Sequence, residues 1–239
     1  MDTAFFRFYA DLNYFLPAHR RQITFPCPVY DGHQSVKHLV EALGIPHTEI
    51  ELILVDGSAV DFSHIVQAGE RVSIYPPFFS LEHTHENKLR PPLQEPVRFL
   101  LDNHLGRLAR YMRLLGFDTL YFNNQLDDEE LADLSHDSQR VLLTRDRGLL
   151  KRSQVTYGYC LRTVEPYEQL KSVVLRFKLA HKIEPWKRCL RCNGILQPVD
   201  KEAVLERLEP RTKRYIEDFQ LCQSCEQIYW RGSHITHLQ

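Results

Sequence analysis

The sequence lacks several features that would place it in a broad class at once. It has no run of about 18 apolar residues, which excludes a transmembrane helix. The first residues, MDTAFFRFYADL, lack the basic stretch, apolar segment and small-residue cleavage site of a secretory signal. Internal repeats and long low-complexity tracts are also missing. We therefore expect a soluble, cytoplasmic protein with no membrane partner.

A strong excess of charge is missing as well. The formal net charge is −1, and the hydrophobic fraction of 43% is enough for packed cores. Residues 1–80 carry five basic and nine acidic side chains, whereas residues 97–187 carry fifteen basic and twelve acidic ones. A mildly basic middle region with clustered acids fits a phosphate-bearing substrate held around metal ions, and it also fits ordinary surface charge.

Two breaks divide the chain into parts. Residues 76–96 hold five prolines among polar and charged residues, a composition typical of a semi-extended linker. The second break lies at Glu184-Pro185-Trp186. The predicted organisation is a first domain over 1–80, a linker over 81–96, a second domain over 97–184 and a small module over 185–239.

The first part has the pattern of an α+β fold. Strand-like segments occur at residues 4–9, 22–25, 52–55 and 71–75. A short amphipathic helix over 35–43 follows the first pair, with Ser35 as its N-cap and Gly44 as its stop. Two strands, a helix and two or more further strands within about 75 residues predict a ubiquitin-like β-grasp domain.

The middle part alternates strands and helices. Strands are predicted at residues 97–101, 119–122, 140–144 and 159–161, and helices at 104–115, 128–136 and about 167–181. Alternation of this kind predicts an α/β domain with a parallel sheet.

Three aspartates fall where such a sheet gathers its ligands, beyond the carboxyl ends of the strands. Asp102 follows the first strand, Asp146 follows the strand 140–144 after one intervening residue, and Asp128 opens a helix. Oxygen ligands of this kind bind Mg²⁺ or Mn²⁺, which can promote phosphodiester cleavage. The three carboxylates are therefore predicted to converge on a metal centre.

Each aspartate also has a structural explanation, and these alternatives stay open. Asp102 can cap the helix that follows it. Asp127 is a good N-cap with Glu130 three residues later, which would leave Asp128 as a first-turn carboxylate favoured by the helix dipole. Asp146 can be a turn residue before a glycine.

Several sequence segments carry a family resemblance. DEELA at 128–132 and RVLLTRDR at 140–147 resemble the third and fourth motifs of PIN nucleases, and FLLD at 99–102, GRLAR at 106–110 and GFD at 116–118 resemble the Mut-seven C-terminal RNase family. Residues 36–75 resemble the ubiquitin-like domain often fused ahead of that nuclease. The resemblance covers nearly the whole chain. It implies a PIN-like, metal-dependent ribonuclease with Asp102, Asp128 and Asp146 as catalytic residues.

The chain departs from the PIN pattern at one position. Many PIN nucleases carry a fourth acid on an earlier helix, whereas the segment 104–115 contains none. Asp118 precedes a strand and should lie at the opposite edge of the sheet. A fourth carboxylate for the metal centre would have to come from Asp127 or Glu129. The sequence is therefore compatible with either one or two metal ions at the centre.

Basic side chains near the acids are candidates for binding an RNA backbone. They are Arg107, Arg110, Arg113, Arg145, Arg147, Lys151 and Arg152. The first three repeat at i, i+3 and i+6, and Arg145 and Arg147 flank Asp146. The alternative is a solvated helix face.

The cysteines predict a second metal site. Cys189-x-x-Cys192 and Cys222-x-x-Cys225 supply four thiolates, the ligand set of a closed structural zinc site such as a zinc ribbon. The 29 residues between the pairs include a helix-like insertion at 201–218. Two redox dithiols or disulfides are the alternatives. The following segment YWRGSH, residues 229–234, resembles the family's C-terminal motif; Trp230 would stack on RNA bases or pack beneath the zinc site.

Three functions compete at this point. The first is a metal-dependent ribonuclease, and the second is a non-catalytic RNA-binding or adaptor protein with the same fold. A sulfur-carrier role is weaker, because such carriers end in Gly-Gly whereas this domain runs through Tyr75-Pro76-Pro77-Phe78. RNA is the expected partner, with a protein partner for the β-grasp domain as a further expectation.

Overall fold

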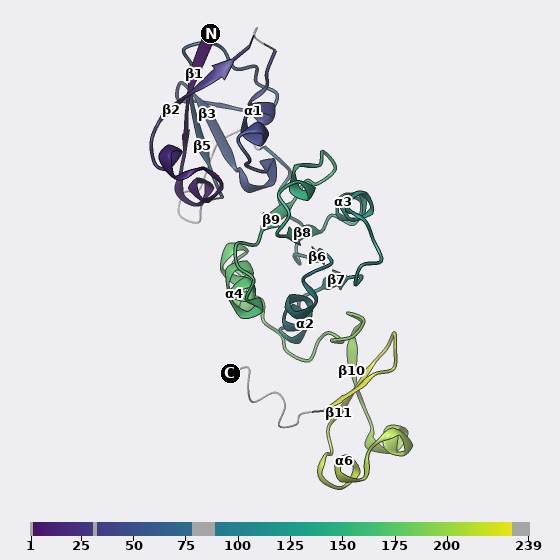
Figure 1. Ribbon diagram of the computed structural model, residues 1–239. Helices are drawn as coiled ribbons and strands as arrows, with labels where there is room; N and C mark the ends of the chain where they lie inside the picture. Colours follow the sequence, from purple (N-terminus) through teal and green to yellow (C-terminus); the bar gives the residue numbers. More distant parts are fainter. Residues whose placement is uncertain (1, 31–32, 78–88, 231–239) are drawn as a thin grey trace. The chain divides into compact units, whose positions relative to one another are not determined.

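The computed structural model describes residues 2–30, 33–77 and 89–230. The chain forms two compact units that alternate along the sequence. Figure 1 labels their helices and strands in chain order. Unit 1 holds residues 1–95 and 127–160, and unit 2 holds 96–126 and 161–239. The predicted domain borders at residues 80, 96 and 184 stay a prediction. Residues 81–88 of the predicted linker and residues 231–234 of the C-terminal motif lie outside the described residues.

Unit 1 begins with a five-stranded sheet in the order β2-β1-β5-β3-β4. Its strands are β1 (Asp2–Phe8), β2 (Phe25–Val29), β3 (Leu52–Val55), β4 (Ser58–Val60) and β5 (Arg71–Tyr75). The β1 and β5 strands run parallel, and the other neighbours run antiparallel. Phe6, Ile53 and Ile74 are fully buried in its core. This is the predicted β-grasp topology.

Helix α1 (Val36–Ala42) follows β2, and its Ser35 side chain accepts a hydrogen bond from the His38 amide, as predicted. The second strand begins later than predicted, at Phe25. Two 3₁₀ turns, η1 (Ala10–Phe15) and η2 (Ala18–Arg20), come before it, and Gln22 has a φ of 59°. A left-handed residue cannot continue a strand, so the strand predicted at 22–25 is shifted along the chain and runs from Phe25 to Val29.

The same unit contains a parallel strand pair, β8 (Val141–Thr144) and β9 (Gly158–Cys160), with α3 (Asp128–Asp137) before it and η4 (Leu149–Lys151) within it. The turn η3 (His47–Glu49) of the β-grasp region packs against β9. The buried Glu49 carboxylate accepts a hydrogen bond from the Cys160 amide at 2.6 Å. Residues of the N-terminal domain thus help to support β9.

Unit 2 contains the parallel pair β6 (Phe99–Leu101) and β7 (Thr119–Tyr121), with α2 (Gly106–Leu114) between them. Helix α4 (Pro166–Arg176) packs against α2, and Phe177 meets Phe99 edge to face. The helix predicted to reach residue 181 ends at Arg176. Lys178 takes a φ of 51°, and the amides of Lys178 and Leu179 donate to Leu175 and Val174, a Schellman stop without glycine. A short 3₁₀ turn, η5 (Ala180–Lys182), follows.

The C-terminal part of unit 2 is an antiparallel sheet in the order β10-β11-β12. Its elements are β10 (Leu196–Val199), α5 (Lys201–Val204), η6 (Leu205–Arg207), α6 (Pro210–Tyr215), β11 (Phe219–Cys222) and β12 (Ile228–Trp230). The predicted helical insertion is two short helices, because Pro210 cannot continue a helix that began at Lys201. Val204 and Leu208 of the insertion pack on Phe219 and Ile228. None of the described helices is long and apolar enough to cross a membrane.

The turn after α2 depends on a glycine. Gly116 has a φ of 92°, and a Cβ there would lie 2.1 Å from the Glu184 carbonyl oxygen. The Glu184 amide in turn donates to the Leu115 carbonyl. Gly116→Ala is expected to lower the free energy of unfolding by about 3 kcal/mol, the sum of left-handed strain and overpacking.

The matched control for this prediction is Gly44→Ala. Gly44 has the same φ of 92°, but no atom lies within 4 Å of the position that a Cβ would take. Only the strain of about 1–2 kcal/mol is expected there. Denaturant unfolding of both variants compares the two costs, and equal losses would show that the approach of Glu184 is unimportant.

Candidate functional site

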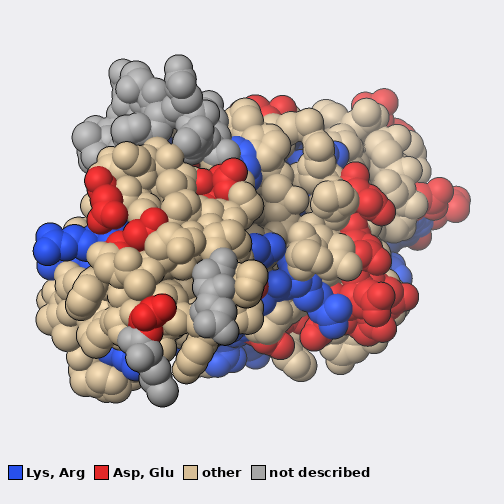
Figure 2. Space-filling view, turned by 90° about the horizontal axis from the view of Figure 1, so that it is seen from above, with Lys and Arg blue, Asp and Glu red and all other residues tan. Residues whose placement is uncertain are grey.

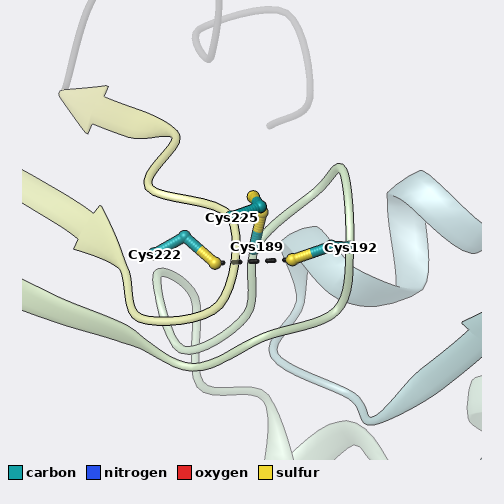
Figure 3. Close-up of side chains that lie close together, drawn as sticks. All are labelled: Cys189, Cys192, Cys222 and Cys225. Atoms are coloured by element: carbon teal, nitrogen blue, oxygen red, sulfur yellow. Dashed lines mark hydrogen bonds between the residues drawn. The ribbon is translucent and has the colours of Figure 1, made fainter.

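Four cysteines of unit 2 converge on one point. The thiol sulfurs of Cys189, Cys192, Cys222 and Cys225 lie within 4.8 Å of one another, and all four thiols are free (Figure 3). Cys189 Sγ lies 3.6 Å from Cys225 Sγ, and Cys192 Sγ lies 3.4 Å from Cys222 Sγ. The predicted grouping is confirmed, and neither pair forms a disulfide. Four thiols in one cluster can hold a single metal ion such as zinc.

The two C-x-x-C segments use the same backbone turn. In the first cysteine turn, Cys189–Gly194, the Asn193 amide donates to the Cys189 carbonyl and Asn193 has a φ of 69°. In the second cysteine turn, Cys222–Gln227, the Glu226 amide donates to the Cys222 carbonyl and Glu226 has a φ of 56°. The repeated geometry turns both sulfurs of each pair towards the shared centre.

The second cysteine turn approaches Gly194 so closely that no side chain fits there. A Cβ at this position would lie 2.6 Å from Ser224 Oγ and 2.9 Å from Cys222 Sγ. The sequence predicts a tight turn at this glycine; in the structure the neighbouring Asn193 has the left-handed conformation, and Gly194 provides the space between the two cysteine turns.

The thiols of the cluster differ in acidity. Burial raises the pKa of Cys189, but hydrogen bonds from the Tyr229 hydroxyl and from the backbone amides of Cys192 and Arg191 outweigh it and lower the pKa to about 7. Burial raises the pKa of Cys192 to about 12. Neighbouring thiolates repel each other without a cation between them, so a bound divalent metal would favour deprotonation of the whole set.

The first cysteine turn is fixed to the β7 end of the parallel pair. Asn193 Oδ1 accepts from the Thr119 amide at 2.9 Å, and Asn193 Nδ2 donates to Asp118 Oδ1 at 2.8 Å. Arg188 pairs with the other oxygen of Asp118 at 3.2 Å. Asp118 therefore has a structural role at the start of β7, in keeping with its predicted place away from the acidic centre.

Arg113 is buried, and the prediction that it continues a solvent-facing row with Arg107 and Arg110 is wrong. Its side chain is 4% exposed and donates to the carbonyls of Leu190 and Arg191 at 3.1 Å each, and to Thr119 at 2.9 Å. Burial lowers the pKa of its guanidinium. Its partners lie 77 and 78 residues away in sequence, so the helical pattern could not reveal them.

Two of the predicted acidic residues lie in unit 1. Asp146 is exposed beyond β8; its amide donates to Thr144 Oγ1 at 2.9 Å, and its Oδ1 accepts from the Gly148 amide at 2.6 Å. One of the two carboxylate oxygens of Asp146 therefore has the predicted role in the turn. Asp128 is the exposed first residue of α3, whose N-cap Asp127 forms the predicted capping box.

Asp102 belongs to unit 2 and directly follows β6. Its side chain is partly buried, and its Oδ1 accepts from the Asn103 amide at 2.5 Å. Helix α2 begins later, after Leu105, and no side chain caps it. The capping alternative for Asp102 is therefore not observed.

The basic candidates have different surroundings. Arg107, Arg110 and Arg145 are exposed. The guanidinium of Arg147 lies 5.0 Å from the ring centre of Phe15 and 5.6 Å from that of Tyr14. Lys151 donates to the Glu41 carbonyl, and Arg152 is half-buried. On the face seen in Figure 2, basic and acidic side chains both form small groups, so neither sign covers this face.

Comparison with known proteins decides the family. Residues 97–239 match the model of the Mut7-C RNAse domain, and residues 1–82 match that of the Mut7-C ubiquitin domain. The chain belongs to the Mut7-C RNAse domain family. This confirms the resemblance seen in the sequence. In this Mut7-C chain, the N-terminal β-grasp sheet is the ubiquitin-like domain of the family.

Individual relatives cover parts of the Mut7-C chain. The human protein named exonuclease mut-7 homolog is 32% identical over 102 residues, which are 40% of this chain and 12% of that protein. The crystal structure of H. volcanii small archaeal modifier protein 1 is 21% identical and covers 33% of this chain and all of that chain, with a TM-score of 0.26. A second structure of the Haloferax volcanii protein is 22% identical, covering 32% and 96%, with a TM-score of 0.25.

Proposed function

We propose that this protein is a metal-dependent ribonuclease that hydrolyses RNA phosphodiester bonds at Asp102, Asp128 and Asp146. The match of residues 97–239 to the Mut7-C RNAse domain carries the proposal. The word exonuclease in the name of the human relative supports the same reaction class. The proposal includes a PIN-like domain over 97–184 and a zinc-ribbon-like module over 185–239.

The chemistry of the three side chains suits Mg²⁺ or Mn²⁺. Carboxylate oxygens are the hard ligands that these ions select, in contrast to the soft thiols of the cysteine cluster. Asp128 is exposed and makes no hydrogen bond or ion pair with the described residues through its side chain. Asp146 uses one oxygen for the Gly148 amide, and its Oδ2 accepts no hydrogen bond from the part of the chain that is described. Both carboxylates can therefore ligate a cation.

Their positions along the fold support a shared centre. Asp102 and Asp146 follow β6 and β8, which each belong to a parallel pair. The carboxyl ends of parallel strands are where α/β folds bind ligands. The proposal therefore takes one carboxylate from the residue after β6, one from the turn after β8 and one, Asp128, from the first turn of α3.

The expected chemistry follows from the side chains. A bound Mg²⁺ or Mn²⁺ would polarise the scissile phosphate and lower the pKa of an attacking water. The carboxylates would hold the cation and orient that water by accepting its hydrogen bonds. Exposed guanidinium groups such as that of Arg145, next to Asp146, would bind the phosphate oxygens of the strand.

The test compares cleavage of end-labelled single-stranded and structured RNA by the full chain with Mg²⁺, with Mn²⁺ and without either. Asp128→Asn is expected to lower the rate by about tenfold or more, because a metal ligand loses its charge. Asp133→Asn is the matched control, since Asp133 is an exposed acid on the same helix.

Two outcomes would contradict the proposal. Absence of cleavage by the wild type on every RNA and metal would favour the non-catalytic RNA-binding alternative. Equal rates for Asp128→Asn and Asp133→Asn would leave Asp128 with its helix-dipole role alone, worth about 0.3–1 kcal/mol.

A further inference from the structure

Unit 2 contains a cavity between α2, the segment that follows β7 and the two cysteine turns. Its volume is about 760 Å³. A cavity of about 300–1,000 Å³ suits a single small ligand or one unit of a polymer. Two of its walls come from the RNAse α/β region, and the third comes from the cysteine module.

The charge of this cavity has one sign. Arg107 and Arg110 of α2 and Arg191 of the first cysteine turn line it, and none of the described residues that line it is acidic. All three arginines are exposed, and their guanidinium groups make no ion pair or hydrogen bond with the described residues. Three unpaired guanidinium groups around one hollow favour an anion with several oxygens, such as phosphate.

Aromatic side chains also line the cavity. They are Tyr121, Phe122 and Tyr229. The Tyr121 hydroxyl donates to the Asn103 carbonyl at 2.8 Å, and the Tyr229 hydroxyl accepts from the Leu190 amide at 3.1 Å. Both rings are therefore held in place. Fixed aromatic rings beside guanidinium groups are the combination that binds the bases and backbone of single-stranded nucleic acid.

We propose that this cavity binds one nucleotide of a single-stranded RNA, with its phosphate on Arg107, Arg110 and Arg191 and its base against the aromatic rings. The choice of RNA rests on the proposed function. A base in a duplex would have to leave its stack to enter, so a single strand is the expected form. The cysteine module then forms part of the substrate site in addition to stabilising the fold.

The cavity is built before any ligand binds. Arg113 connects α2 to the carbonyls of Leu190 and Arg191, and Asn193 connects the same turn to Thr119 and Asp118. These four hydrogen bonds fix the position of Arg191 relative to Arg107 and Arg110. A preorganised site loses less conformational entropy on binding.

The test measures binding to the full chain by fluorescence anisotropy, without added Mg²⁺ or Mn²⁺. The pocket variant carries Arg107→Gln, Arg110→Gln and Arg191→Gln. The charge-matched control carries Arg211→Gln, Lys213→Gln and Arg214→Gln on α6, outside the cavity. The ligands are a labelled single-stranded RNA of ten nucleotides, the same RNA in a duplex, and free AMP as competitor.

The pocket variant is expected to bind the single strand at least about tenfold more weakly. The slope of its log affinity against log salt should become shallower by about 0.7, the value for one phosphate contact on a single strand. The control should keep both values. Phe122→Ala should weaken binding by about tenfold through loss of stacking. Zinc content and thermal unfolding establish that each variant is folded.

The proposal is overturned if the pocket variant binds the single strand like the wild type, or if the α6 control loses as much affinity. It is also overturned if the duplex binds as tightly as the single strand, or if AMP binds more tightly than the RNA, which would indicate a small-molecule site. Cleavage assays on the same proteins separate the two proposals. Pocket-dependent binding without any cleavage would contradict only the ribonuclease, and cleavage with pocket-independent binding would contradict only the pocket.

Discussion

Asp146→Asn is expected to lower the rate of RNA cleavage by at least about 100-fold, because the substitution removes a charged ligand from the proposed metal centre. The amide keeps the size of the side chain, and its oxygen can still accept the Gly148 amide hydrogen that Asp146 Oδ1 accepts now. The turn beyond β8 should therefore be preserved. The measurement is the single-turnover cleavage rate in Mg²⁺, with thermal unfolding recorded on the same samples.

The comparison for Asp146 again uses Asp133→Asn, which removes one exposed carboxylate from the same unit without touching the turn. Its cleavage rate should stay within about twofold of the wild type, as is usual for a surface substitution. A wild-type rate in Asp146→Asn would exclude this residue from the centre. A loss of rate that comes with a lower unfolding temperature would show a structural role instead.

Removal of the proposed zinc ion is expected to unfold the cysteine module. Cys222 is fully buried at the end of β11, and its sulfur faces that of Cys192 (Figure 3). In small zinc modules, metal binding contributes about 10–16 kcal/mol to the free energy of folding near pH 7. Cys222→Ser should therefore leave most of this module unfolded. Elemental analysis of the wild type, purified without added metal, should find about one zinc per chain, and Cys222→Ser should contain far less.

Proteolysis within residues 201–218 reports the unfolding of the module. The insertion depends on a small apolar cluster with Phe219 and Ile228, which belong to the strands that carry and follow the cysteines. Cys27→Ala is the control, since Cys27 is a buried free thiol of unit 1 and the cysteine cluster belongs to unit 2. Absence of zinc in the wild type, or a full equivalent in Cys222→Ser, would refute the Cys₄ assignment.

The pH dependence of metal binding has a definite sign. Binding displaces protons from the thiols, so a lower pH favours the free cluster. Cys189, with its pKa lowered to about 7, is the thiol that deprotonates most readily. The thiol of Cys192, with a pKa of about 12, releases its proton to the solvent only when the metal displaces it. Zinc affinity is therefore expected to rise with pH above 7.

Signals that lie close together in the sequence predict the structure well. The cap at Ser35 and the capping box of Asp127 and Glu130 are formed as expected, because each needs only residues within one helical turn. The cysteine cluster is predictable because the spacing of each pair fixes its own turn. The β-grasp domain is predictable from the succession of two strands, a helix and further strands along the chain.

Where the prediction from the sequence differs from the structure, the cause is a contact between residues far apart in the chain or an unusual backbone conformation. Arg113 has the residue type and the rough spacing of a surface arginine, and only the folded chain brings the carbonyls of Leu190 and Arg191 to it. Helix α4 ends early because Lys178 adopts the left-handed conformation usually given to glycine. The cavity could not be predicted, because its walls come from two stretches of the chain, residues 106–125 and 190–229, that are far apart in sequence.

The alternation of the two units has a consequence for how the protein is made and how it can be cut. Glu49 is synthesised 111 residues earlier than Cys160, whose amide donates a hydrogen bond to the buried Glu49 carboxylate. The ubiquitin-like domain is therefore translated long before its own unit is complete. A fragment boundary between residues 82 and 97, where the two family matches divide the chain, separates the partners of that hydrogen bond. The isolated N-terminal piece would expose a carboxylate that is only 1% exposed in the whole protein.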